Sequence, residues 1–580
     1  METIPLNSIL TIHAMSTAEV YFDGHLILPF TVSLQDWKKP QTINLNNFLT
    51  TGEHEIYITV FNKNGPALLL AYCEALKLFT GEDWEASLDR TDWAQAVPVD
   101  RISTPELSKN FTSPTESFLS LIPFYLPLFV VIFFLTIFLH FKPDRIGWIR
   151  KLMSNPSKIR WLLLGAWTVL AMNNIAKIPL YIGFDVKEHY DYIMYVAEKW
   201  RVPLPNEGWQ MFQSPLYYLI SAALYSILSQ FFSIKTVAIM LRIIPLISGA
   251  MQVEISYRAV RYIFPTRWDL QVMGTIIGGL LPMNLYISQV VGNEPLSGIL
   301  SATVVIMGLR LLQSGRDIFQ KKHLVFLGAV LGFALLTKVT AVLLIPPVMF
   351  LLIYVMLKNG QSIKNIIAGL LLVLSVTFII SGWYYLRNWI ELGKPFIGGW
   401  ESSRQIVWWQ DPGYRTMQDS ISFGKSLTYP IYSAVNGFWD SIYSTLWLDG
   451  FIGSITSYEF RPPWNYNFML SGALLALLPT AGIIIGILAT VLRPSTASQN
   501  GQLFSVYCIG IYFIALFYLY SNVPIYSTAK ATYTLGLIPC YAIMCVTGLN
   551  FIMSNIYMRA GIYALFSCWA IAAYLSYLVL

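Results

Sequence analysis

The chain has 580 residues, of which 55% are hydrophobic, 15% are aromatic and only 12% are charged, with a formal net charge of +6. A soluble globular protein carries about 25% charged residues, so this composition excludes an ordinary soluble domain over most of the length. The small net charge gives no indication of a nucleic-acid partner, and no glycine-rich phosphate loop is present. The five cysteines show neither a disulfide framework nor a metal-ligand spacing.

Residues 1–112 differ in pattern from the rest of the chain. Short β-rich runs such as AEVYFDGHLI and HEIYITVFNK alternate with turn signals such as FDG and NKNG. This spacing predicts a small all-β sandwich or jelly roll, and the region is acidic. Its segment INLNNFLTTGEHEIYITVFNKNGPALLL resembles the jelly-roll accessory domains of carbohydrate-active enzymes. Trp84 and Trp93 suit either a sugar-stacking surface or the core of this domain.

The pattern of residues 117–580 predicts a polytopic α-helical membrane domain. Apolar segments of about 17–25 residues follow one another, the length that a bilayer core requires, and we expect about twelve spans. The segment 142–160 holds six Lys and Arg residues against Asp144 alone, which places it in the cytoplasm. The first span then exports the N-terminal domain, although the N-terminus lacks a signal-peptide pattern.

This orientation predicts extracytoplasmic loops at about 184–235 and 385–465. It requires SPLYYLISAALYSILSQFF, residues 214–232, to be a juxtamembrane or re-entrant helix and not a full span. The polar segments VVGNEPL and PIYSTAKATYTL then lie on the same external side. Polar residues gathered at one membrane face favour an active site that is open to the exterior.

A dense group of ionisable residues follows the second apolar segment, in YIGFDVKEHYDYIMYVAEKW, residues 181–200. Ionisable groups at a membrane boundary are functional candidates, although charged span ends in the interface are also common. On a helix, Glu188 and His189 would share a face with Asp185, because they follow it at i+3 and i+4. The sequence therefore predicts a site around Asp185.

The segment 183–222, GFDVKEHYDYIMYVAEKWRVPLPNEGWQMFQSPLYYLISA, resembles the first external loop of GT-C glycosyltransferases. The likeness is to the branch of protein mannosyltransferases and lipid A aminoarabinose transferases. Four later signatures fit in order over about residues 160–550: NEPL, GFALLTKVT, SGWYYLRNW and YSTAKATYTL. The resemblance implies a multi-pass enzyme that moves a sugar from a polyprenyl-phosphate-linked donor to a glycan, lipid or protein acceptor, usually with inversion.

The resemblance also implies roles for single residues. Asp185 matches the general base that removes the acceptor proton. Asn293 and Glu294 match a second acidic position. If a metal such as Mg or Mn is used, Asp185 and Glu294 would supply oxygen ligands, but two carboxylates alone do not make a metal site.

Basic and polar residues complete the expected substrate site. The leaving phosphate needs preorganised cations, and Lys530 and Arg387 are the candidates. Lys338 could serve the same purpose. For all three residues, the alternative is a basic side chain that extends from a span end to the membrane interface. Glu188 and His189 would orient Asp185 or contact the sugar.

Two other functions fit the composition. A transporter or flippase for lipid-linked sugars would carry ionisable residues near the bilayer midplane, whereas those here gather at span ends. A non-catalytic sugar-binding membrane protein would not need acids at both 185 and 294. Membrane lipids are partners in every case.

Overall fold

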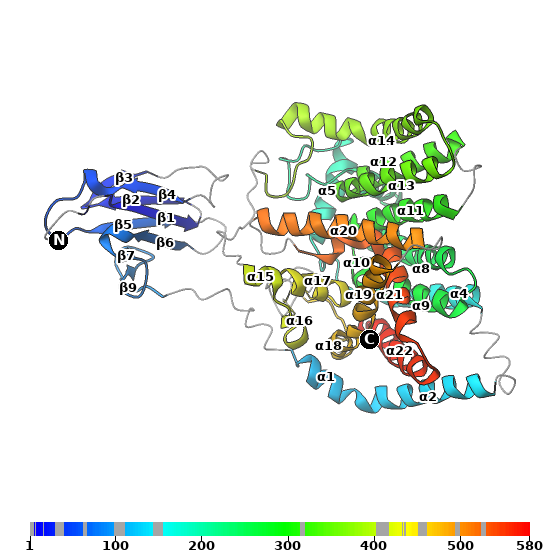
Figure 1. Ribbon diagram of the computed structural model, residues 1–580. Coiled ribbons are helices and arrows are strands. Elements are labelled where there is room, and N and C mark those ends of the chain that lie inside the picture. The colour runs from blue at the N-terminus through cyan, green and yellow to red at the C-terminus, as the bar shows by residue number, and fades with distance from the viewer. Residues whose placement is uncertain are drawn as a thin grey trace. The chain divides into compact units, whose positions relative to one another are not determined.

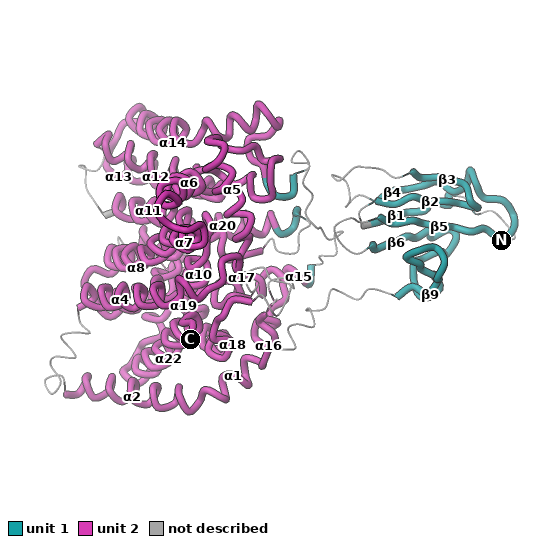
Figure 2. The backbone as a smooth tube through the Cα atoms, turned by 180° about the vertical axis from the view of Figure 1, so that it is seen from behind, with its two compact units in different colours: residues 1–105, 398–418, 520–528 teal, residues 106–397, 419–519, 529–580 magenta. Residues whose placement is uncertain are grey.

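The computed structural model describes residues 5, 7–15, 17–29, 40–61, 67–97, 111–142, 155–313, 320–401, 417–431, 433, 437–450, 461–493, 499–523 and 529–580. The chain divides into two compact units (Figure 2), which are residues 1–105, 398–418 and 520–528, and residues 106–397, 419–519 and 529–580. The basic segment 142–160 and the predicted loop 385–465 lie partly outside the described residues.

The N-terminal unit contains a β-sandwich, as the sequence predicts. One antiparallel sheet has the strand order β4-β1-β6-β7 and the other has the order β3-β2-β5, while β8 and β9 pair separately (Figure 1). The strands and short 3-10 helices are β1 (Ile9–Met15), β2 (Thr17–Phe22), β3 (His25–Leu28), β4 (Gln41–Asn44), η1 (Leu45–Asn47), β5 (Ile56–Phe61), β6 (Leu68–Cys73), η2 (Glu74–Leu76), β7 (Leu78–Phe79), β8 (Glu85–Ala86) and β9 (Ala94–Gln95).

Alternation along the strands builds one core between the two sheets. Every second residue of β2 is buried, and the side chains of Val20 and Phe22 pack in one cluster with Leu10 and Ile12 of β1. The predicted FDG turn joins β2 to β3 as a two-residue hairpin loop, in which Asp23 and Gly24 have φ of 48° and 79°. Such positive φ values match the twist of a tight hairpin and explain the Asp-Gly pair.

The second unit is helical. Its elements, together with the two helices that reach a unit boundary, are α1 (Pro114–Ser120), α2 (Ile122–Phe141), α4 (Pro156–Asn174), α5 (Val186–Lys199), α6 (Leu216–Leu228), α7 (Ile234–Met240), α8 (Ile243–Ile263), α9 (Trp268–Leu280), α10 (Pro282–Ile287), α11 (Glu294–Gln313), α12 (Lys321–Thr337), η5 (Val339–Leu344), α13 (Ile345–Lys358), α14 (Ile363–Leu392), α15 (Met417–Ile421), α16 (Lys425–Thr428), α17 (Phe438–Trp447), α18 (Tyr466–Leu475), α19 (Leu477–Leu492), α20 (Gln499–Asn522), η10 (Ala531–Leu537), α21 (Ile538–Ile552) and α22 (Ile556–Ser576).

Nine helices within the described ranges are long and apolar enough to cross a membrane. They confirm a polytopic helical architecture, but the predicted number of about twelve spans is not confirmed. The second predicted span, α4, is not among the nine. Helix α6 has 13 residues, about 20 Å at 1.5 Å per residue, which is shorter than the hydrocarbon core of about 30 Å. This length agrees with the expectation that SPLYYLISAALYSILSQFF is not a full span.

Close packing around α11 brings distant signatures of the sequence together. Helix α11 packs against α8, α12 and η10 (Figure 1). Glycines on both partners permit the approach to η10: a Cβ on Gly298 would lie 2.7 Å from Leu535, and one on Gly536 would lie 2.4 Å from Ser301. The first residue of α11 is Glu294, and η10 begins directly after Lys530. The NEPL and YSTAKATYTL segments therefore meet at one place.

Candidate functional site

Asp185 stands at the N-terminus of α5 in an unusual backbone conformation. Its φ is 50°, in the left-handed region that Asp and Asn tolerate better than most residues. Its side chain makes no capping hydrogen bond to α5, although its carbonyl oxygen accepts one from the amide of His189 at 2.9 Å. The side chain is partly exposed. The alternative of a simple helix cap therefore does not describe this carboxylate.

His189 lies one turn along α5 and contacts Tyr218 of the SPLYY segment. Only 2% of the residue is exposed, and its Nδ1 lies 2.8 Å from the hydroxyl of Tyr218. Tyr218 stacks on Tyr192 with ring centroids 3.7 Å apart, and the neighbouring Tyr217 accepts a hydrogen bond from the amide of Gly292. Burial lowers the pKa of the His189 imidazole, so the neutral form is favoured. The SPLYY segment thus supports this part of the site.

Glu294 forms the central ion pair of the site. Its Oε1 accepts a hydrogen bond from Lys338 Nζ at 2.6 Å, and its Oε2 lies 4.0 Å from His189 Nε2. Lys338 has an extended backbone conformation, and the helix therefore breaks at this residue, between α12 and η5. Gly292 leaves room for this arrangement, because a Cβ there would lie 3.2 Å from Glu294 Oε2.

Lys530 is the second lysine that precedes a 3-10 helix. It is extended at the start of η10, and its Nζ lies 4.9 Å from the ring centroid of Phe184. Burial lowers the pKa of the Lys530 ammonium, while the nearby carboxylates of Asp185 and Glu294 oppose this shift. Lys530, Asp185 and Glu294 therefore belong to one electrostatic cluster.

The remaining acidic and polar candidates on these helices divide into two kinds. Glu188 is half-buried, and burial raises the pKa of its carboxyl group. Asn293 is fully buried: its amide donates to Gln213 Oε1 at 3.3 Å and to the carbonyl of Thr337 at 3.2 Å, and its Oδ1 has no hydrogen-bond partner among the described residues. Asp191, by contrast, forms an exposed ion pair with Lys187.

Arg387 makes contacts outside this cluster. Its guanidinium donates to the carbonyl of Val202 at 3.0 Å and to Asn388 Oδ1, and it lies 5.0 Å from the ring centroid of Tyr384. These contacts tie α14 to the chain that follows α5. A phosphate contact of Arg387 stays a prediction.

Two further carboxylates have local structural partners. Asp440 Oδ1 accepts hydrogen bonds from the amides of Gly424 and Ser426. Asp449 Oδ2 accepts one from the indole of Trp464 at 3.0 Å. Many of the aromatic residues in the sequence between 396 and 465 lie outside the described residues.

The donor set fits a divalent metal poorly. Within the described ranges no three His, Cys, Asp or Glu residues are arranged to hold a metal ion. Lys338 already neutralises Glu294 at 2.6 Å, and Lys530 lies near both predicted ligands. Two lysine ammonium groups beside two carboxylates disfavour the binding of a metal cation, because the cations repel one another.

Sequence reasoning missed the aromatic part of the site. The sequence presents Tyr217 and Tyr218 only as part of the GT-C resemblance and gives no role to Tyr533, although Lys338 Nζ lies 5.1 Å from the centre of the Tyr533 ring. Each lysine of the cluster therefore lies close to an aromatic ring: Lys338 to Tyr533 and Lys530 to Phe184. The sequence signal for these rings is that an aromatic residue lies near an ionisable one: Phe184 precedes Asp185 in GFD, and Tyr533 follows Lys530 in AKATY.

Comparisons with known proteins give matches only among solved structures. No protein-family model and no curated protein matches the chain. The structure of ArnT from Cupriavidus metallidurans bound to undecaprenyl phosphate has 15% sequence identity and a TM-score of 0.43, over 75% of this chain and 77% of that one. The Archaeoglobus fulgidus oligosaccharyltransferase in complex with Zn and sulfate has 13% identity and a TM-score of 0.38, over 71% of this chain and 53% of that one.

A third match is AglB from Archaeoglobus fulgidus in complex with an inhibitory peptide and a dolichol-phosphate, with 12% identity and a TM-score of 0.38 over 72% of this chain. The chain spans about half the length of these oligosaccharyltransferases, 53% and 56%. These proteins are GT-C glycosyltransferases, the superfamily that the sequence resemblance names. With TM-scores below 0.5, they do not carry a functional assignment, which depends on this chain's own residues.

Proposed function

We propose that this protein is an integral membrane glycosyltransferase that moves a sugar from a polyprenyl-phosphate-linked donor to an acceptor hydroxyl. The observation that carries the proposal is the cluster of Asp185, Glu294, Lys338 and Lys530. It combines a partly exposed carboxylate, which suits a base, with the buried cation Lys338 and the partly buried cation Lys530, which suits a phosphate. The GT-C resemblance of the sequence supplies the donor class.

Asp185 acts as the general base. As the acceptor oxygen attacks the anomeric carbon, its proton passes to the Asp185 carboxylate, and the bond from the anomeric carbon to the phosphate oxygen breaks with inversion. A base needs a lone pair that can reach substrate, and Asp185 is suited because it is partly exposed and does not cap its own helix. Glu294 is less suited, because Lys338 occupies its Oε1.

Lys530 stabilises the leaving phosphate. Negative charge grows on the phosphate oxygens as the glycosidic bond breaks, and a fixed cation in a site with little water stabilises it most effectively. Lys530 is partly buried, and its ammonium lies 4.9 Å from the centre of the Phe184 ring. The ammonium of Lys530 therefore binds the donor phosphate in this proposal.

Glu294, Lys338 and His189 position the reacting groups. The ion pair joins the start of α11 to the break after α12, and His189 links it to α5, which carries Asp185. Asn293 is fully buried and its amide bonds Gln213 and the Thr337 carbonyl, so a contact of its side chain with the sugar stays a prediction. The reaction takes place on the extracytoplasmic face, as the distribution of Lys and Arg residues predicts.

Mass spectrometry of lipids that remain bound to the detergent-solubilised protein tests the donor class. We expect a polyprenyl phosphate or its glycosylated form in the wild type, and a strong loss of it in Lys530→Met. Lys187→Met is the matched control, because Lys187 lies on α5 as an exposed partner of Asp191. Bulk phospholipid alone in the wild type would contradict the proposal.

A further inference from the structure

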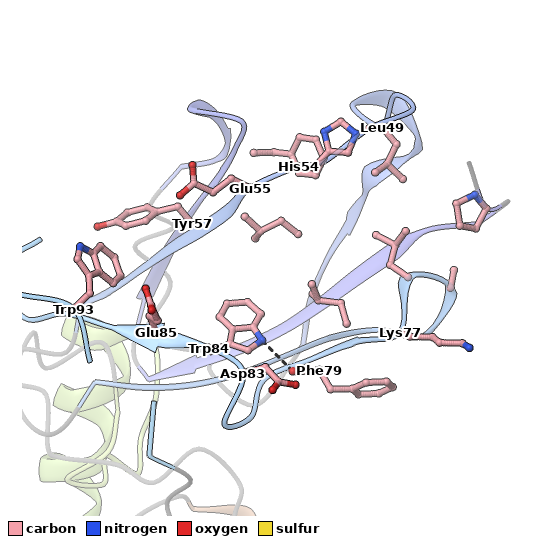
Figure 3. Close-up of a pocket in the computed structure, with 17 residues that line it drawn as sticks. Leu49, His54, Glu55, Tyr57, Lys77, Phe79, Asp83, Trp84, Glu85 and Trp93 are labelled. Carbon is pink, nitrogen blue, oxygen red and sulfur yellow. Dashed lines mark hydrogen bonds between the residues drawn. The ribbon is translucent and has the colours of Figure 1, made fainter. Parts of the chain in front are cut away.

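A large cavity opens on the β-sandwich, apart from the helical cluster. Its volume is about 1010 Å³, and all its lining residues belong to the N-terminal domain, between Pro5 and Trp93 (Figure 3). Ligand pockets commonly measure about 300–1,000 Å³, so this one has room for an extended ligand. Its lining combines aromatic rings with carboxylates.

The two tryptophans of the cavity have different roles. The indole of Trp84 donates to the carbonyl of Phe79 at 3.0 Å, and the ring packs against the core of the sandwich. Trp93 is 45% exposed, and its ring meets Tyr57 edge-to-face with centroids 5.8 Å apart. Single exposed aromatic residues are common on protein surfaces, but Trp93 lines the cavity beside Tyr57. Its exposed indole is therefore accessible to a ligand in the cavity.

Carboxylates accompany this aromatic pair. Glu55 directly precedes β5, which contains Tyr57. Glu85 pairs with Gln95, which lies two residues beyond Trp93. Figure 3 draws both glutamates toward the end of the cavity where Tyr57 and Trp93 lie, with Asp83 beside Trp84. All three carboxylates belong to exposed residues.

The positive charges near the cavity do not offset them. Lys77 lies toward the other end of the cavity in Figure 3. His54 is held by Asp23 at 2.6 Å and by the carbonyl of Thr50 at 2.8 Å. Arg90 lies near Tyr57, 5.7 Å from its ring centroid, but is not part of the lining. The balance of charge in the lining therefore remains negative.

We propose that this cavity binds a non-acidic glycan, with a sugar ring packed on Trp93. One face of a pyranose ring carries mostly C–H groups and suits an aromatic ring, while its hydroxyls donate to carboxylates in charge-assisted hydrogen bonds. A free amino group on the sugar would add attraction, and a uronic acid would be repelled. The site is independent of the transfer chemistry proposed for the helical unit.

Binding to the full-length detergent-solubilised protein tests the site. Saturation-transfer NMR and affinity titrations would use oligosaccharides of three kinds: neutral, amino-bearing and uronic-acid-bearing. We expect the neutral and amino kinds to bind and the uronic kind to bind at least several-fold more weakly. Trp93→Ala should weaken binding about tenfold, which corresponds to about 1.4 kcal/mol, and Trp93→Phe should recover part of the loss.

Phe61→Ala is the control, because Phe61 is a 58% exposed aromatic residue of β5 outside the cavity lining. It should bind as the wild type does. Asp185→Asn should also leave this affinity unchanged, so that a failure here is distinct from a failure of the proposed transfer. The proposal is overturned if no neutral or amino glycan binds, if the uronic kind binds equally well, or if Trp93→Ala matches the wild type.

Discussion

The helical unit and the β-sandwich hold their carboxylates in opposite ways. In the helical unit, Glu294 has a 15% exposed side chain and meets Lys338 at 2.6 Å. In the sandwich, Glu55 and Glu85 lie exposed beside an aromatic pair. A desolvated charge needs a partner, because burial costs several kcal/mol, whereas an exposed one does not. Removing the Glu294 charge should therefore lower the stability of the helical unit, whereas removing the Glu85 charge should leave the stability of the sandwich almost unchanged.

The largest expected effect is that of Asp185→Asn on transfer. Loss of a general base lowers the rate about 10²–10⁴-fold. Asn also tolerates a φ of 50°, so the fold should be kept and the loss should be chemical. Incorporation of labelled sugar in membranes that contain the variant measures it. Asp191→Asn, on the same helix, should retain wild-type transfer, and equal rates for the two variants would contradict the role of Asp185.

Lys530→Met should lower transfer about 10²–10³-fold, the usual cost of removing one donor to a developing oxyanion. Because burial lowers the pKa of Lys530, its ammonium loses a proton at lower pH than an ordinary lysine, and the rate should fall as pH rises through that pKa. Lys530→Arg keeps its charge above pH 12 and should move this alkaline limb upward. Identical pH profiles for Lys530→Arg and the wild type would exclude Lys530 as the titrating group.

Glu294→Gln should destabilise the helical unit by about 3–5 kcal/mol, because it leaves Lys338 buried without its counter-charge. The second substitution Lys338→Met should restore most of the loss, since it removes the uncompensated cation. Thermal unfolding in detergent measures both variants as changes in Tm. If the single variant unfolds at the wild-type Tm, the pair is not a structural ion pair.

The smallest expected effect is that of Glu85→Gln on stability. Glu85 is exposed, so its loss should change the free energy of unfolding by less than about 0.5 kcal/mol. Comparison with Glu294→Gln in the same thermal assay sharpens the contrast between the two regions. A large drop in Tm for Glu85→Gln would show that the carboxylates of the sandwich are structural after all.

Local patterns predicted a good part of the fold. The FDG turn, the alternation of β2 and the long apolar helices all follow from short-range rules. The predicted number of about twelve spans is not confirmed. Helix α4 carries charged and amide side chains that lower its hydropathy, and α12 has only 17 residues, so neither is among the nine candidate spans. The hydropathy of a helix depends on its composition, so it does not determine whether the helix crosses the membrane.

The resemblance to GT-C enzymes predicted which residues to consider, but not how they meet. Lys338 and Glu294 are 44 residues apart and pair only because the chain breaks its helix before η5. The contact of Lys530 with Phe184 and that of Lys338 with Tyr533 likewise join residues that are far apart in the sequence. Contacts of this kind depend on three-dimensional neighbours, which a single sequence does not display.

The most direct test of the central claim is the state of the lipid bound to Asp185→Asn. Native mass spectrometry would compare this variant with Asp191→Asn, both prepared from the same host. If Asp185 is the base, Asp185→Asn should accumulate the glycosylated polyprenyl phosphate, while Asp191→Asn should carry the same lipid mixture as the wild type. An equal proportion of glycosylated lipid on both variants would contradict the assignment of Asp185 to sugar transfer.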